Sequence, residues 1–245
     1  MSIPNVCLLM AMHAEARPVI DRLGLEEVSP PWPDWMPMRL YQRSRPTRVS
    51  LLLFGRDERF GVDLIGTQAA TLAASQSVEH LRPDLVISAG TCGGFLLRGG
   101  AIGDVYLSEG DFVFHDRRVP LEGFHESSLG QYPSMDVRAL AAALGLKTGV
   151  VTTGDALDAL DACRERMEGA GASVKEMEAA AIAWVCSLAG VPMFAVKAVT
   201  DLVDGEHPTE AEFVQNLSLA VDRLAGSLDR VLRALSSEPP AGVAQ

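Results

Sequence analysis

The sequence contains few of the patterns that mark redox, metal-dependent or serine-hydrolase proteins. Its 245 residues include only four cysteines, which are far apart and form no Cys-x-x-Cys pair, so no disulfide framework is predicted. The five histidines show none of the spacings HxH, HExxH or HxxxH, and we expect no metal site. The Gly-x-Ser-x-Gly elbow of serine hydrolases is also missing.

Long apolar runs and an excess of positive charge are missing as well. Without a run of about 18 apolar residues, no membrane span is expected. The N-terminal segment has no basic region and predicts a strand and a turn rather than a signal peptide, so we expect a cytoplasmic protein. With 32 acidic and 21 basic residues, the chain is poorly suited to nucleic-acid phosphates. A nucleoside carries no phosphate and is not excluded.

The chain does contain short apolar strands that alternate with helical segments. The strands lack strict polar alternation, which is typical of a sheet covered by helices on both faces. We therefore predict an α/β fold, a single three-layer domain over residues 1–236 with a central mixed sheet flanked by helices, and a disordered tail over 237–245. The expected strands are 6–10, 49–54, 85–88, 105–107, 149–152 and 193–196, and the expected helices are 14–23, 64–81, 176–188 and 210–236.

Polar residues or small turns follow four of the predicted strands. They are Met12–Glu15, Ala89–Gly94 (AGTCGG), Thr153–Asp155 and Thr200–Asp201. Ligands of α/β sheets collect at the carboxyl ends of the strands, so these segments are predicted to converge on a binding site.

None of these segments assigns a function by itself. The glycines of 89–94 fit a ligand cradle or a tight strand-to-helix turn, but they match neither a P-loop nor a dinucleotide GxGxxG, and we expect no cofactor. Glu15 lies in the first turn of a predicted helix, and Glu176 and Glu178 open another, where the helix dipole favours acidic residues in any case. Asp201 is compatible with a simple capping role.

The segment 174–205, VKEMEAAAIAWVCSLAGVPMFAVKAVTDLVDG, resembles the nucleoside phosphorylase/hydrolase superfamily. Within it the chain is most similar to the plant-type branch of 5'-methylthioadenosine/S-adenosylhomocysteine nucleosidases. AMHAEARP, SAGTCGGF, IGDVY, FHDRR and DLVDGEHPTEAEFVQNL are similar too, so the matching motifs occur from residue 10 to about residue 217. The resemblance implies hydrolysis of 5'-methylthioadenosine, and possibly of S-adenosylhomocysteine, to adenine and a thioribose in methionine salvage.

The resemblance also implies the catalytic groups. Asp201 would protonate N7 of adenine, and Glu15 would act as general base on the attacking water. Glu178 would accept hydrogen bonds from the ribose 2'- and 3'-hydroxyls. The chemistry is consistent with this set, because an acid makes adenine a competent leaving group, a base prepares the water, and nearby negative charge favours the cationic sugar of the transition state.

Five further residues would bind or position the reactants. Met177 would lie beneath the sugar, Met12 would pack near the ribose and alkylthio end, and Thr91 and Lys197 would position the water. Leu157 aligns with an aromatic residue that stacks on adenine in relatives, so stacking would be weaker here or come from another residue.

Partners and alternatives follow from the same resemblance. The family usually forms homodimers in which a neighbour's loop, aligned here with residues 119–124, closes the alkylthio pocket. Glu15 would repel phosphate, which favours hydrolysis, although Arg17 and Arg56 leave a purine nucleoside phosphorylase as an alternative. Two further alternatives are a futalosine-type hydrolase and a binding protein without catalysis. The similarity to the plant-type branch favours 5'-methylthioadenosine over S-adenosylhomocysteine as the substrate.

Overall fold

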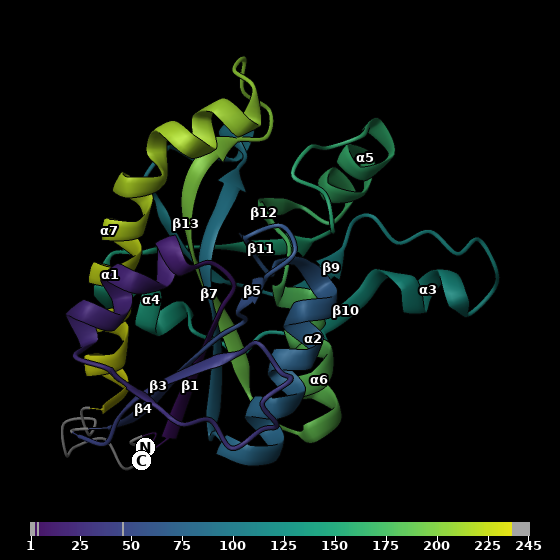
Figure 1. The fold of residues 1–245 in the computed structure, drawn as a ribbon. Helices are drawn as coiled ribbons and strands as arrows, with labels where there is room; N and C mark the ends of the chain where they lie inside the picture. Colours follow the sequence, from purple (N-terminus) through teal and green to yellow (C-terminus); the bar gives the residue numbers. More distant parts are fainter. Residues whose placement is uncertain (1–2, 4, 46, 237–245) are drawn as a thin grey trace, which may run out of the picture.

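The computed structural model describes residues 3, 5–45 and 47–236, and Figure 1 shows their arrangement. The strands are β1 Asn5–Met10, β2 Glu26–Val28, β3 Arg39–Arg43, β4 Arg48–Leu53, β5 Arg56–Asp57, β6 Val62–Asp63, β7 Leu85–Gly94, β8 Val105–Ser108, β9 Asp111–Phe114, β10 Gly130–Pro133, β11 Lys147–Thr153, β12 Ala172–Glu176 and β13 Met193–Leu202. The α-helices are α1 His13–Leu23, α2 Gly66–Gln76, α3 Phe124–Leu129, α4 Arg138–Leu144, α5 Asp161–Gly169, α6 Ala179–Ala189 and α7 Thr209–Ser236. A π-helical turn, Ser77–Leu81, continues α2, and a 3₁₀ turn covers Leu96–Arg98.

Eleven of the strands form one mixed sheet. Its order is β10-β9-β11-β8-β13-β7-β1-β4-β3-β2, with β12 pairing both β11 and β7. The central strands β4, β1, β7 and β13 run parallel, whereas β8 is antiparallel to β13. Because β12 connects β11 back to β7, the strands β7, β13, β8, β11 and β12 close into a ring. This closure brings the end of β12 close to β13.

Helices cover both faces of the sheet, as the apolar strands predict. Side chains of β1 alternate between two buried clusters: Cys7 and Leu9 pack with alanines of α2 and α6, while Val6 and Leu8 pack with α1 and α7. The alanines of α2 and α6 allow these two helices to pack closely over the sheet. Figure 1 shows α1, α4 and α7 on one side of the sheet and α2 and α6 on the other. The predicted three-layer α/β fold is confirmed.

Several predicted boundaries were wrong. The strand predicted at 85–88 continues to Gly94, so the glycine segment 89–94 is strand and not a turn, and the strand predicted at 193–196 continues to Leu202. The helix predicted at 176–188 begins only at Ala179, because Glu176 ends β12. The strands β3, β9 and β12 were missed, and the predicted tail, 237–245, lies outside the described residues.

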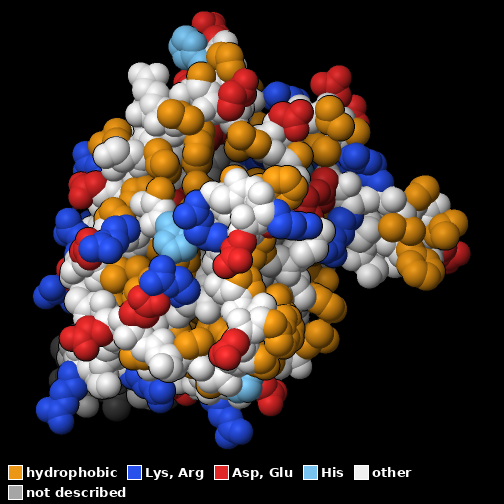
Figure 2. Space-filling model, viewed as in Figure 1, with side chains coloured by type: hydrophobic (Ala, Val, Ile, Leu, Met, Phe, Trp, Pro, Cys, Tyr) orange, Lys and Arg blue, Asp and Glu red, His pale blue; other side chains and the backbone are white. Residues whose placement is uncertain are grey.

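An arm that carries α3 extends from the edge of the sheet (Figure 1). Hydrophobic side chains gather at its end (Figure 2), where Leu121 and Phe124 are 62% and 63% exposed. Within residues 3, 5–45 and 47–236, no helix combines the length and the apolar character needed to cross a membrane.

Candidate active site

A cavity of about 590 Å³ lies where β1, β7 and β13 end, and its lining comes from distant parts of the chain. All eight residues predicted for the site line it: Met12, Glu15, Thr91, Leu157, Met177, Glu178, Lys197 and Asp201. Three of the four predicted strand ends therefore converge. The fourth, Thr153–Asp155, lies behind the cavity, where it binds the residues that support the wall: Thr153 donates to Glu176, and Asp155 accepts from Thr67.

Glu15 is buried in the first turn of α1, with 4% of its surface exposed. Its Oε1 accepts hydrogen bonds from the Thr91 backbone N–H at 2.9 Å and from the Thr91 hydroxyl at 2.5 Å. Burial raises the pKa of Glu15, while the Thr91 bonds and the charge of Lys197 act in the opposite direction. A buried carboxylate with two fixed donors on one oxygen has its other oxygen, Oε2, available for a water.

The glycines of β7 allow the two candidate catalytic carboxylates to lie against the strand. A Cβ on Gly90 would lie 3.1 Å from Glu15 Oε2, and a Cβ on Gly93 would lie 2.7 Å from Asp201 Oδ2. Side chains at these positions would displace the carboxylates. The sequence left a ligand cradle or a tight turn open for these glycines. In the structure they belong to a strand, and the side chains that lie against Gly90 and Gly93 are the protein's own carboxylates.

Asp201 lies near the end of β13 and is 3% exposed. The pairing of β13 with β7 shifts register between Val199 and Asp201, and such a bulge re-aims the following side chain. Thr200 donates its hydroxyl to Asp201 Oδ1 at 2.7 Å. Burial raises the pKa of Asp201. The Thr200 hydrogen bond and the charge of Lys175 act in the opposite direction, but the net shift is upward. The site therefore favours the protonated form of Asp201 more than water does.

Glu178 lies at the start of α6, and its Oε1 accepts a hydrogen bond from the Gly66 N–H at 3.0 Å. Burial, followed by the negative charge of Glu176, raises the pKa of Glu178 from 4.5 to about 7. Met177 precedes it and lines the same wall. The carboxylate thus has one oxygen bound to the protein and one, Oε2, available to a ligand hydroxyl.

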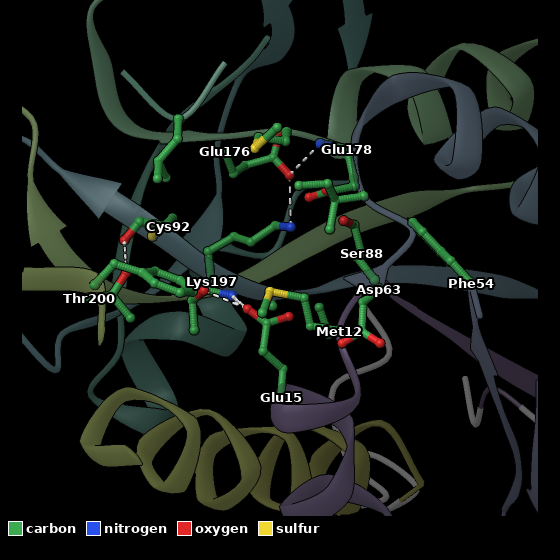
Figure 3. A pocket seen from close by; sticks show the side chains of 18 of the residues that line it. Met12, Glu15, Phe54, Asp63, Ser88, Cys92, Glu176, Glu178, Lys197 and Thr200 are labelled. Atoms are coloured by element: carbon green, nitrogen blue, oxygen red, sulfur yellow. Dashed lines mark hydrogen bonds and ion pairs between the residues drawn. The ribbon is translucent and has the colours of Figure 1, made fainter. Parts of the chain in front are cut away.

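Lys197 and Glu176 form an ion pair at the floor of the cavity. Lys197 Nζ lies 2.7 Å from Glu176 Oε2, and the two side chains are 2% and 1% exposed. Burial lowers the pKa of Lys197, but Glu176 and Glu178 outweigh it, so the net shift is upward and the amine stays charged. Figure 3 shows the ammonium directed to Glu176, with Glu15 on its other side.

Sequence reasoning missed several of the lining residues, among them Glu176, Ser88, Lys175 and Phe213. Glu176 was interpreted only as a helix opener, although the doubled glutamates of EMEAAA could have indicated a second role. Ser88 carries a buried hydroxyl that has no hydrogen-bond partner among the described residues, so it can bind a ligand. Lys175 and Phe213 gave no local signal. In the part of the chain that the structure describes, no cluster of three metal-ligating side chains occurs.

Comparisons with known proteins agree with this geometry. The model of the phosphorylase superfamily matches residues 5–233. A 5'-methylthioadenosine nucleosidase of Arabidopsis thaliana is 40% identical over 232 residues, which cover 94% of this chain and 86% of the relative. A 5'-methylthioadenosine/S-adenosylhomocysteine nucleosidase of the same plant is 36% identical, covering 96% and 93%.

Solved structures extend the agreement to the whole fold. The Arabidopsis thaliana 5'-methylthioadenosine nucleosidase superposes with a TM-score of 0.94 at 38% identity, over 98% of each chain. The futalosine hydrolase of Helicobacter pylori reaches 0.77 at 21% identity, covering 95% of this chain and 98% of that one, and shares the fold alone.

Proposed function

Since the chain belongs to the phosphorylase superfamily, we propose that it is a nucleosidase that hydrolyses the N-glycosidic bond of 5'-methylthioadenosine. The products are adenine and 5-methylthioribose, which places the reaction in methionine salvage. Its two Arabidopsis relatives carry this activity in their names and match nearly the whole chain.

One observation carries the assignment of roles: Glu15 and Asp201, 186 positions apart in the sequence, are both buried and line one cavity. In the proposed reaction Asp201 donates its proton to N7 of adenine as the bond to C1' breaks. Glu15 removes a proton from the attacking water. Each group accelerates the reaction by about 10²–10⁴-fold when correctly placed.

The remaining groups bind the sugar and the water. The Glu178 carboxylate accepts hydrogen bonds from the vicinal diol, a pairing of two donors with one anion that is stronger than a neutral contact. Its charge, with that of Glu15, favours the positive charge that develops on the ribose. Thr91 and Lys197 position the water, and Met12 contacts the alkylthio end.

The carboxylates favour water over phosphate as the nucleophile. Glu15, Glu176 and Glu178 surround the Lys197 ammonium at the floor, and the other buried lysine of the lining, Lys175, donates to the carbonyls of Ala156 and Leu157. A phosphate dianion there would meet more negative than positive charge. Arg17 points elsewhere, to Asp21, while Arg56 lines the cavity and its guanidinium donates to the carbonyl of Gly61.

We propose further that the protein acts as a homodimer in the cytoplasm. Leu121 and Phe124 of the arm expose apolar surface that an isolated chain leaves in water, and the predicted contact loop, 119–124, contains both. Sedimentation at several protein concentrations tests the oligomeric state.

The assay that tests the function measures adenine released from 5'-methylthioadenosine in phosphate-free buffer. We expect turnover there, unchanged by added phosphate, and slower turnover of S-adenosylhomocysteine. Glu15→Gln and Asp201→Asn should each reduce kcat about 10²–10⁴-fold. The control is Asp84→Asn, an exposed residue at the opposite end of β7.

The alternatives give different results in the same assay. An absolute phosphate requirement with a sugar 1-phosphate product would identify a phosphorylase. Preference for a nucleoside with a bulky 5' carboxylate would identify a futalosine-type hydrolase. Binding of adenine nucleosides without release of base would identify a non-catalytic protein.

A further inference from the structure

Glu176 has more hydrogen-bond contacts than a simple helix opener needs. Its side chain is 1% exposed, and the carboxylate accepts the Lys197 ammonium at 2.7 Å, the N–H of Glu178 at 3.1 Å, and the N–H of Ala179 at 3.0 and 2.9 Å on its two oxygens. Thr153 donates its hydroxyl to the same group. One side chain thus holds both the lysine at the cavity floor and the backbone that carries the diol carboxylate.

Lys197 lies beside the candidate general base as well as beside Glu176. The Cβ position of Gly90 is 3.1 Å from Glu15 Oε2 and 3.7 Å from Lys197 Nζ, so both atoms flank one glycine. The ammonium is therefore within a small movement of Glu15. Its charged neighbours are Glu176, Glu178 and Glu15, on β12, at the start of α6 and on α1.

We propose that Glu176 is a positioning residue of the hydrolysis: its carboxylate holds the Lys197 ammonium away from Glu15 and fixes the Met177–Glu178 backbone beneath the sugar. This inference rests on the proposed function. One buried anion thereby supports both the water side of the reaction, through Lys197, and the sugar side, through the α6 backbone.

The physical reason is competition for a buried charge. An ammonium that loses its partner inside a protein pairs with the next available anion, because an unpaired buried charge is strongly unfavourable. Glu15 and Glu178 are the anions within reach. A direct Lys197–Glu15 pair would occupy the lone pair that must accept a proton from water, so the base would be blocked even though every catalytic side chain is present.

Three variants test this: Glu176→Gln, Lys197→Met and the double variant. Gln keeps an oxygen for the α6 backbone but gives up the charge. We expect kcat on 5'-methylthioadenosine to fall about 10²-fold in Glu176→Gln, the size of loss that a misplaced catalytic group causes, with a smaller change in KM. The acid limb of its pH profile should move to lower pH, since Glu176 raises the pKa of Glu178 and since Lys197 would then act more strongly on Glu15.

The double variant distinguishes coupling from separate structural roles. It removes the charge pair as a whole, which proteins commonly tolerate, so it should fold. If Glu176 acts through Lys197, the double variant is as active as Lys197→Met alone; independent effects would multiply. Thr153→Val is the matched control, because it removes a contact to Glu176 without changing the ion pair. We expect it to lower the melting temperature and to leave kcat within a few-fold of the wild type.

A crystal structure of Glu176→Gln gives a result that needs no substrate. The inference expects Lys197 Nζ to move into contact with Glu15 or Glu178. An ammonium that stays in place, or multiplicative losses in the double variant, would overturn it. If the wild type released no adenine, the proposed function would fail, while the position of Nζ in the variant would still decide whether Glu176 holds it.

Discussion

Ionisation of Glu178 should make the folded protein less stable at neutral and higher pH, where the proposed reaction uses its charge. Burial and the charge of Glu176 raise its pKa from 4.5 to about 7. At about 1.4 kcal/mol per pH unit, the difference between those two values corresponds to about 3 kcal/mol. Replacing it by Gln keeps an oxygen for the Gly66 N–H and removes the ionisation.

The sign follows from the order of ionisation. Below about pH 4 the carboxyl is protonated in both the folded and the unfolded chain, and it contributes nothing. Between about pH 4.5 and pH 7 the unfolded chain loses this proton while the folded chain keeps it, so the free energy of unfolding falls. Above pH 7 the loss is complete. Glu178→Gln should therefore gain up to about 3 kcal/mol over the wild type at pH 8, relative to their difference at pH 4.

Urea denaturation at half-unit intervals from pH 4 to pH 8 measures this difference. The control is Glu165→Gln, which makes the same substitution at an exposed glutamate of α5. Adenine release must be lost in Glu178→Gln, so stability and activity move in opposite directions. A difference between Glu178→Gln and wild type that does not grow with pH would refute the reasoning.

Three further predictions concern the proposed acid, Asp201, and the proposed base, Glu15. Asp201→Asn should abolish the basic limb of the kcat profile, because the raised pKa keeps this acid protonated until the pH rises through it. Thr91→Val removes a donor to Glu15, so the acid limb should move to higher pH in a titration of kcat/KM. Gly93→Ala places a Cβ 2.7 Å from Asp201 and should cost about 10²-fold in kcat, whereas Gly169→Ala, where nothing lies within 4 Å, should leave activity unchanged.

Much of the fold could be predicted because its core strands are apolar runs. The segments Val6–Met10 and Val49–Leu53 needed no partner information to be identified as strands. The strand Arg39–Arg43 was missed, because only Leu40 and Tyr41 are buried and the rest of its composition is polar. The Ala172–Glu176 strand was missed for another reason: its charged end is satisfied by a lysine 21 positions further along the chain, and no local pattern reveals that.

The sequence predicted which residues line the site but not how these residues contact one another. The family motifs identified the eight expected residues. Parallel strands that end at one edge of the sheet bring them together. The support of Lys197 by Glu176 depends on β12 closing the ring of strands, a tertiary event. The glycines of β7 were interpreted as a ligand cradle or a tight turn, whereas the groups that lie against Gly90 and Gly93 are side chains distant in sequence, Glu15 and Asp201.

The surroundings of the two proposed catalytic carboxylates differ in the number of donors that they offer. Burial raises the pKa of both. Glu15 is opposed by a hydroxyl, a backbone N–H and the Lys197 ammonium, all of which stabilise its ionised form. Asp201 receives one hydroxyl, from Thr200, and the weaker influence of Lys175. Donors to a carboxylate favour its charged form, so the contacts of Glu15 are those that a general base needs. Hydrolysis requires an ionised base together with a protonated acid, and the fewer donors around Asp201 are consistent with the proposed division of roles.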